Sequence, residues 1–223
     1  MSVSTLILGE SGTGKSASMR YLNPEETLLI QIVRKPLPFL SKGWSYFDKE
    51  RGSGNIFVCD RFDLIIKAVS KTKKKIIVID DFQYLMANEF MRRSDEKSYD
   101  KFTDIGKHAW EVITQVTNLP DDVRVYITAH TDTSDLGKVT IKTIGKLLAD
   151  KICLEGLFSI VLRTRVIDRQ FLFSTQNDGN DTVKSPMGLF SNELIDNDLA
   201  AVDAAICAYY GISSQPTQIK AAA

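Results

Sequence analysis

The octapeptide GESGTGKS at residues 9–16 restricts what this chain can fold into more than any other stretch of its sequence. It follows a short apolar run at 3–8 and precedes residues 15–22, which suit a helix that starts directly at the loop. Strand, glycine loop and helix in this order match the pattern G-x-x-x-x-G-K-[ST], in which backbone N–H groups and a helix N-terminus hold phosphate groups. The sequence therefore predicts a phosphate-binding loop in an α/β protein.

Two side chains of this loop have separate expected roles. Lys15 should reach the β- and γ-phosphates of a bound nucleotide, and the Ser16 hydroxyl should ligate Mg²⁺. The residues of the loop that are expected to contact the nucleotide are Gly9, Glu10, Ser11, Gly12, Thr13, Gly14, Lys15 and Ser16.

A second acidic motif ends the apolar run at 75–80 and completes the expected site. Asp80 stands at the end of this run and is expected on the metal side of the site. Asp81 is a candidate to orient or deprotonate the attacking water, or alternatively to cap a helix at 82–91. The chain has no Asn-Lys-x-Asp motif for reading guanine, so we expect ATP with Mg²⁺ as the bound nucleotide.

The remaining pattern predicts an α/β fold with a mostly parallel, buried central sheet. Apolar runs of strand length alternate with helical patterns, which is typical of parallel sheets with helical crossovers. The expected strands are 3–8, 27–33, 55–59, 75–80 and 123–129, and the expected helices between them are 60–71 and 101–118. Two segments, 34–54 and 88–101, fit neither pattern and are expected to be long loops.

The texture of the sequence changes after residue 143. The runs 157–166 and 169–175 predict an antiparallel hairpin joined at 167–168, and 193–210 predicts a C-terminal helix with acids near its N-terminus. We expect one domain over residues 1–212, followed by a tail at 213–223.

Charge, cysteine spacing and hydropathy bear on the partners and the location of the protein. Lysine plus arginine equals aspartate plus glutamate, 28 each, so the overall charge gives no reason to expect a polyanionic partner. The three cysteines, Cys59, Cys153 and Cys207, lack metal-site spacing and are expected to be buried in a reducing compartment. Neither a membrane-spanning run nor a basic N-terminal segment is evident, so we expect a cytoplasmic protein without a membrane partner.

The order of these motifs resembles the RecA-like core ATPases, and most of all the small phage-encoded versions that assist single-strand annealing and recombination. The loop at 9–16, the strand at 76–81, a strand ending at 128–130 and a hairpin carrying Arg163 and Arg165 appear in that order over residues 1–190. The resemblance implies a three-layer P-loop NTPase with a RecA-like core, a C-terminal β-hairpin and a helix. It also implies a DNA-stimulated ATPase in the host-cell cytoplasm.

The same resemblance implies partners and further site residues. Partners would be single-stranded DNA, a single-stranded DNA-binding protein, and copies of the chain itself with ATP between protomers. His130 would sense the γ-phosphate, unless it is simply a hydrogen-bonded residue at a strand end. Lys184 would complete the neighbouring site in trans, with the Arg163–Arg165 pair as the second choice.

The resemblance further places DNA-contacting loops at 88–101 and 131–142. Their basic residues would contact DNA phosphates, although the acidic residues among them also fit an ordinary solvated loop with mixed charge. The candidate contacts are Arg92, Arg93, Lys138 and Lys142.

One departure from the RecA-like pattern leaves the chemistry open. These enzymes usually carry a catalytic glutamate at the end of the strand after the loop helix, but residues 27–40 contain no acid. Either Asp81 or Asp60 substitutes for it, or hydrolysis is slow and ATP acts as a conformational ligand. This departure favours one alternative, a nucleotide-gated binding module with little turnover. The loop sequence and Asp80-Asp81 also fit an AAA+-type helicase loader or remodelling ATPase, and Arg92 and Arg93 could form the lid of a small-molecule kinase.

Overall fold

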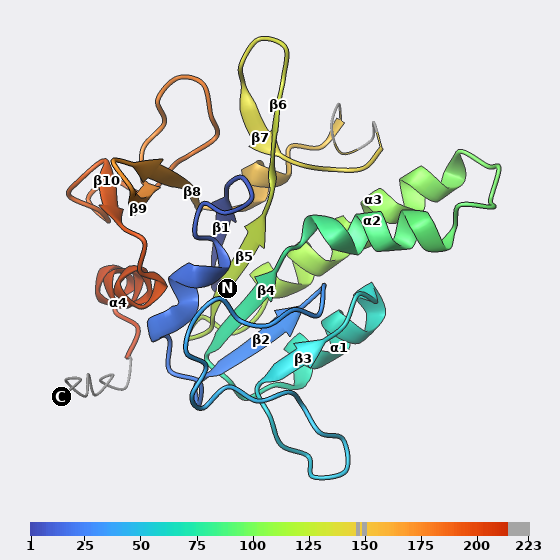
Figure 1. Cartoon of the computed structure of the whole chain (residues 1–223), viewed down its shortest axis with the longest axis horizontal. Coiled ribbons are helices and arrows are strands. Elements are labelled where there is room, and N and C mark those ends of the chain that lie inside the picture. The colour runs from blue at the N-terminus through green and yellow to red at the C-terminus, as the bar shows by residue number, and fades with distance from the viewer. Residues whose placement is uncertain (146–147, 149–150, 214–223) are drawn as a thin grey trace.

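The central element of the fold is an eight-stranded sheet in the order β10-β9-β8-β1-β5-β4-β2-β3 (Figure 1). A computed structural model describes residues 1–145, 148 and 151–213. The strands are β1 (Val3–Leu8), β2 (Thr27–Gln31), β3 (Ile56–Val58), β4 (Ile76–Asp80), β5 (Arg124–Ala129), β8 (Ile160–Ile167), β9 (Gln170–Ser174) and β10 (Leu194–Asp196). Neighbouring strands are parallel from β8 through β1, β5, β4 and β2 to β3. Strand β9 pairs antiparallel with both β8 and β10. The predicted α/β class and mostly parallel sheet are confirmed.

Helices cover both faces of this sheet, because its central strands are apolar on both sides. In β4, Ile77 and Ile79 pack into one buried cluster, while Ile76 and Val78 pack into another on the opposite face. The first cluster lies under α1 (Phe62–Lys71), α2 (Gln83–Arg92) and α3 (Asp100–Thr117). The second lies under the 3₁₀ helix η1 (Ser16–Tyr21) and under α4 (Leu199–Tyr210). This alternation with period two gives three layers.

The helix expected at 15–22 is shorter and tighter than predicted, since η1 is a 3₁₀ helix. The Ser18 hydroxyl donates to the carbonyl oxygen of Lys15, and such a bond competes with regular α-helical pairing. Leu22 N–H bonds back only three residues, to Met19, and Pro24 follows two residues later. Local hydrogen bonding and the proline therefore limit this helix to six residues.

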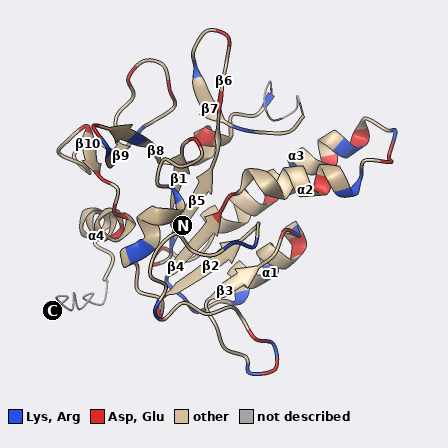
Figure 2. Cartoon of the chain, viewed as in Figure 1, with Lys and Arg blue, Asp and Glu red and all other residues tan. Residues whose placement is uncertain are grey.

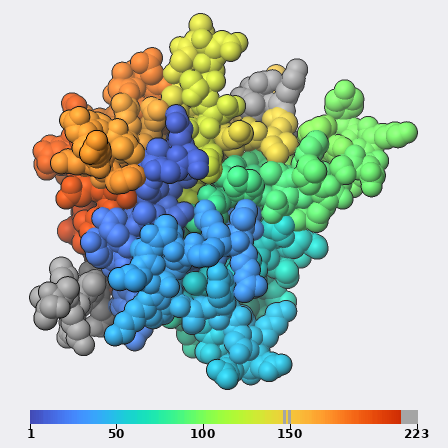
Figure 3. Space-filling view, viewed as in Figure 1, coloured from blue at the N-terminus to red at the C-terminus, as the bar shows by residue number. Residues whose placement is uncertain are grey.

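Two antiparallel hairpins follow β5 in the chain. The hairpin predicted after residue 156 is confirmed, and its turn at Asp168 and Arg169 has φ angles of 50° and 64°. The loop predicted at 131–142 is wrong: it forms a hairpin of β6 (Thr131–Thr133) and β7 (Val139–Ile141). This hairpin projects from the body of the molecule (Figure 3).

The C-terminal helix begins later than predicted. Residues 194–196 form the edge strand β10 in place of a first helical turn. Asp198 then caps α4 by accepting hydrogen bonds from the backbone N–H groups of Ala200 and Ala201. The expected acid at the helix start is thus present, but at a later position. The 3₁₀ helix η3 (Leu154–Leu157) precedes β8, and only Ser213 of the predicted tail belongs to the described residues.

The two segments that resisted prediction differ from each other. In 34–54, Leu37, Phe39 and Trp44 pack against the second apolar cluster, so this segment covers the sheet. The segment 88–101 is not a long loop, because α2 extends to Arg92 and α3 begins at Asp100. Of these two segments, 34–54 is the one that stays a long loop, and its apolar residues cover part of the sheet.

Two expectations from composition can be compared with the structure. Cys207 is buried and Cys59 is half-buried, but Cys153 is exposed, so the prediction of three buried cysteines is wrong for Cys153. Among the described residues, the helices are all too short or too polar to cross a bilayer.

Candidate functional site

The carboxyl ends of β1, β4 and β5 bring three predicted motifs to one edge of the sheet. Leu8 pairs in register with Ala129, and Ile79 pairs with Ile127, so the residues that follow these strands become neighbours. A cavity of about 330 Å³ opens there. Its lining includes Ser11, Gly12, Gly14, Lys15, Ser16, Lys35, Asp81, His130 and Phe171.

A second cavity, of about 600 Å³, lies at the opposite edge of the sheet beside Met1 and Tyr210. It is the larger of the two, but among the described residues its charged side chains are those of Asp121 and Asp122. Asp122 is a surface acid already paired with Lys75, whereas the smaller cavity combines two lysines with Asp81, so the smaller cavity is the better candidate for a functional site.

The loop at 9–16 has a backbone that only glycine fits at several positions. Gly12 and Gly14 have φ angles of 78° and 98°, in the left-handed region. A Cβ atom on Gly9 would stand 1.8 Å from the Thr164 hydroxyl oxygen. That hydroxyl is 2.6 Å from the Thr13 hydroxyl, so β8 supports the loop from the side. The contact with Thr164 could not be predicted, because a threonine inside an apolar strand carries no functional signal.

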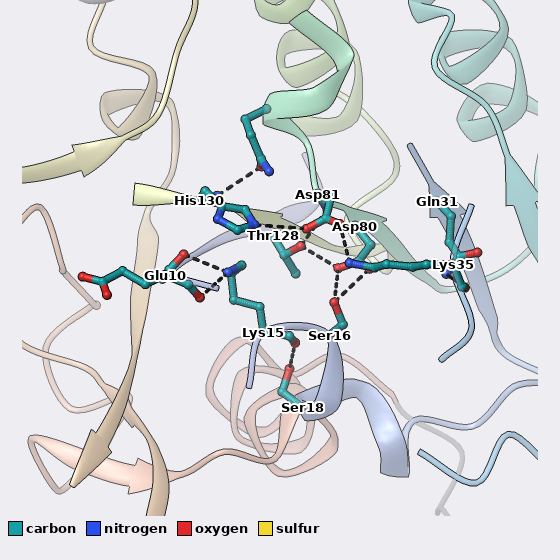
Figure 4. A network of polar contacts seen from close by, with 12 residues as sticks. Glu10, Lys15, Ser16, Ser18, Gln31, Lys35, Asp80, Asp81, Thr128 and His130 are labelled. Atoms are coloured by element: carbon teal, nitrogen blue, oxygen red, sulfur yellow. Dashed lines mark hydrogen bonds and ion pairs between the residues drawn. The ribbon is translucent and has the colours of Figure 1, made fainter. Parts of the chain in front are cut away.

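Lys15 lies folded into its own loop. Its Nζ donates to the carbonyl oxygens of Gly9, at 2.8 Å, and Glu10, at 2.7 Å (Figure 4). Burial lowers the pKa of Lys15 to about 8, although Asp81 and Asp80 act in the opposite direction. The side chain of Glu10 extends away from this cluster (Figure 4). The loop therefore holds one buried ammonium group at the cavity.

Ser16 and Asp80, predicted as the metal-side pair, are in direct contact. The Ser16 hydroxyl donates to both carboxylate oxygens of Asp80, at 2.9 Å and 3.0 Å. Thr128 at the end of β5 donates to Asp80 Oδ1 at 2.7 Å and accepts from the backbone N–H of Asp81 at 2.9 Å (Figure 4). Burial, and then the neighbouring Asp81, raise the pKa of Asp80. A hydroxyl and a carboxylate in contact fit Mg²⁺, which prefers oxygen ligands.

Asp81 faces the cavity and not the start of α2. Its backbone has a φ of 62°, which is unusual for a residue other than glycine and common at functional positions. Within the described residues no side chain caps α2, so the alternative role of Asp81 as a helix cap is not realised. Its carboxylate forms an ion pair with Lys35, and its Oδ1 is 3.7 Å from His130 Nε2.

Lys35 is the main component of the site that the sequence did not reveal. Its Nζ contacts Asp81 and lies 3.8 Å from Asp80 Oδ2. Burial alone would lower the pKa of Lys35, but Asp80 and Asp81 outweigh it and raise this pKa. Gln31 pairs in register with Asp80, and its Nε2 donates to the Lys35 carbonyl at 3.0 Å. The available signal was a basic residue just after β2, at the same edge as Asp80.

His130 follows β5 and closes another side of the cavity. Its backbone N–H donates to Gln83 Oε1 at 3.1 Å, and its ring meets the Tyr84 ring edge to face. Burial, assisted by Lys15, lowers the pKa of His130, so its ring is neutral at neutral pH. A neutral imidazole near Asp81 can donate or accept one hydrogen bond toward the cavity.

Other predicted site residues lie away from this cavity. The backbone of Lys184 pairs with Val161 beside β8, and Lys184 does not line the cavity. Arg163 and Arg165 pair with carboxylates of the segment that follows β9, at 3.4 Å and 3.1 Å. Asp60, a possible substitute acid, instead accepts hydrogen bonds from Arg92 and Asn88.

The predicted DNA-contacting residues fall into two groups. Arg92 pairs with Asp60, and Arg93 pairs with Glu89, Glu96 and Asp104. Both signs of charge are mixed over the turn between α2 and α3 (Figure 2), which favours the alternative of a solvated surface for 88–101. Lys138 and Lys142 instead belong to the β6–β7 hairpin and the residue after it.

No protein-family model matches the sequence, and a search of curated proteins gives no match. The function of the chain is therefore argued from the geometry of this cavity.

Proposed function

We propose that the chain binds Mg²⁺–ATP in this cavity and hydrolyses it, as a RecA-like P-loop NTPase acting on single-stranded DNA in phage recombination or annealing. One observation carries the proposal: the Ser16 hydroxyl of the glycine loop contacts Asp80, two strands away in the sheet, beside the Lys15 ammonium group. Hydroxyl, carboxylate and ammonium groups in this arrangement are the parts that phosphoryl transfer from a nucleotide requires.

Each residue then has a role that follows from its position. The N–H groups of the loop and the Lys15 ammonium group bind the phosphates, and Lys15 exchanges two backbone carbonyls for phosphate oxygens. Ser16 and Asp80 hold Mg²⁺, which supplies positive charge at the phosphates. Asp81 orients the attacking water, and His130, close to its carboxylate, senses the occupied site.

The assembly state belongs to the same proposal. We expect copies of the chain to associate with ATP between protomers, so that Lys184 of one copy completes the site of the next. This fits the position of Lys184 outside its own cavity. Light scattering in the presence of ATP and single-stranded DNA tests it, and a protein that stays monomeric there contradicts a role in trans.

A second function, a nucleotide-gated binding module with little turnover, is favoured by one specific observation. The strand beside Asp80 ends in Gln31, where an acid would be needed, and Asp81 is engaged by Lys35. An AAA+-type protein is less well supported. The described part of 151–213 holds three sheet strands, a short 3₁₀ helix and one α-helix, in place of a helical lid.

Nucleotide binding and turnover separate these functions. We expect Lys15→Ala to weaken ATP binding about a hundredfold or more, because a buried charge-assisted contact to phosphate is lost, with an unchanged melting temperature. Lys42→Ala, on an exposed part of the 34–54 segment, is the matched control. Equal ATP affinity of wild type and Lys15→Ala would contradict the assignment of this loop as a phosphate-binding site.

Turnover of the wild type is then measured with and without single-stranded DNA. Strong stimulation supports the DNA-dependent ATPase. Tight ATP binding with negligible turnover under both conditions supports the binding module instead.

A further inference from the structure

Lys35 is a charged residue of the cavity to which no role has yet been given. Its side chain is 38% exposed, whereas the side chain of its partner Asp81 is 6% exposed. Lys35 thus lies at the rim of the cavity, and its ammonium group reaches inward to a buried carboxylate. Because a flexible four-carbon stem joins this ammonium group to the backbone of Lys35, the ammonium group can leave Asp81 without disturbing buried packing.

The backbone that carries Lys35 is fixed. Gln31 Nε2 donates to the Lys35 carbonyl at 3.0 Å, and the next residue, Pro36, has a restricted φ and lines the cavity with Pro38. The glutamine that makes this contact is itself buried, at 1% exposed. A fixed main chain that carries a cation on a long flexible side chain is suited to contact a ligand that enters the cavity.

The charges of the cavity indicate which ligand this cation meets. Lys15, Lys35 and Asp81 line the cavity and Asp80 lies beside them, so two ammonium groups balance two carboxylates. Lys15 sits within the loop, where the inner phosphates of a nucleotide are expected, whereas Lys35 follows β2 and approaches Asp80 and Asp81 from the side of Gln31 (Figure 4). The phosphate group closest to the acidic strand would be the terminal one.

We propose that Lys35 is a second phosphate-binding cation, which leaves Asp81 to contact the terminal phosphate and so makes the site prefer nucleoside triphosphates over diphosphates. This inference rests on the proposed function, because it assigns a further residue to the same nucleotide site. The transfer also releases the carboxylate of Asp81, which is then available to orient water. Lys35 thereby couples the presence of the terminal phosphate to the state of Asp81.

The test compares affinities for a non-hydrolysable ATP analogue and for ADP, both with Mg²⁺. We expect Lys35→Ala to reduce the preference for the triphosphate about tenfold or more, and to affect ADP much less. Lys35→Arg, which keeps the charge, should retain most of the preference, and Lys42→Ala should retain all of it. If Lys35→Ala does not fold, Lys35→Gln keeps the stem and takes its place.

A double variant separates phosphate contact from simple neutralisation of Asp81. If Lys35 only neutralises that carboxylate, Lys35→Ala/Asp81→Asn recovers the preference shown by Asp81→Asn. If Lys35 contacts the terminal phosphate, the double variant remains as unselective as Lys35→Ala. Recovery of the preference, or equal binding of both nucleotides by wild type, overturns the inference. Failure of the proposed function looks different, because then neither nucleotide binds to wild type.

Discussion

Strand β5 carries a cluster of charged and polar side chains at each end, and the two clusters differ in how their charges are satisfied. At its amino end, Arg124 donates to both carboxylate oxygens of Asp203 on α4, at 2.9 Å each, and the Tyr126 hydroxyl donates to the same carboxylate. At its carboxyl end, Thr128 bonds to Asp80 beside an open cavity. The first cluster is closed on itself, and the second has room for a ligand.

The chemistry of the cations explains this difference. The Arg124 guanidinium is planar and makes a two-pronged contact with Asp203, which fixes α4 against the sheet. Lys15 and Lys35 are point charges held by backbone carbonyls and by one carboxylate, and such contacts can be exchanged for phosphate oxygens. Burial of charge alone therefore does not point to a functional site, whereas burial beside a cavity with exchangeable partners makes a candidate for one.

Breaking the closed cluster should give the largest effect on stability. We expect Asp203→Ala to lower the free energy of unfolding by about 3–5 kcal/mol, because Arg124 would remain buried without its partner. Chemical denaturation measures this directly. The nucleotide affinity of the folded fraction should stay at the wild-type level, since the two clusters lie at opposite ends of β5.

A matched control removes both charges of the closed cluster. Arg124→Met combined with Asp203→Leu should recover much of the lost stability, as apolar side chains of similar size avoid the unpaired charge. A double variant as unstable as Asp203→Ala would contradict the view that the unpaired arginine is the cause.

The open cluster should respond in the opposite sense. We expect Asp80→Asn to weaken Mg²⁺-dependent ATP affinity about ten- to a hundredfold, through loss of one charged ligand. The same change should leave the ligand-free protein equally stable or slightly more stable. A carboxyl group with a raised pKa in the folded state favours folding at low pH and opposes it once ionised, so neutral asparagine removes a penalty at neutral pH.

Calorimetry with and without Mg²⁺, together with thermal melting, measures both parts of this prediction. Asp122→Asn is a control, because Asp122 is a surface acid paired with Lys75 at the other edge of the sheet. A marked loss of stability in Asp80→Asn would show that Asp80 belongs with the structural clusters.

The comparison also explains how far the sequence could be used for prediction. The glycine loop and the strand ending in Asp80 were found because each has a local pattern, and parallel register then brings them together. The ion pair of Arg124 with Asp203 joins residues 79 positions apart and leaves no local pattern. The contacts of Thr164 with Gly9 and of Lys35 with Asp81 are of the same kind.

The errors in predicted elements have equally specific causes. The hairpin of β6 and β7 consists of two three-residue strands, which are too short to show alternation in the sequence. In the segment 88–101, Arg93 pairs with Glu89 of α2 and with Asp104 of α3, and these charged residues hide the end of one helix and the start of the next. Short strands and helices with charged surfaces therefore need tertiary contacts to be recognised.

The smallest effect concerns the pH dependence of the open cluster. Burial places the pKa of Lys15 at about 8 in the ligand-free protein, and phosphate partners should raise this pKa on binding. Below about pH 8, Lys15 is charged in both states and does not change the affinity. At higher pH, binding requires uptake of a proton, so ATP affinity should fall by up to about tenfold per pH unit until the pKa of the bound state is reached.

Titrations of ATP binding from about pH 6.5 to about pH 9.5 test this dependence across the pKa of Lys15. Lys15→Arg should bind with a flatter profile, because a guanidinium group keeps its charge over the whole range. For the same reason, the contact of Arg124 with Asp203 should stabilise the fold equally at both ends of the range. A wild-type affinity that is constant across this range would mean that the Lys15 ammonium group keeps its proton with or without phosphate. The two clusters at the ends of β5 would then differ only in that one of them lies beside a cavity.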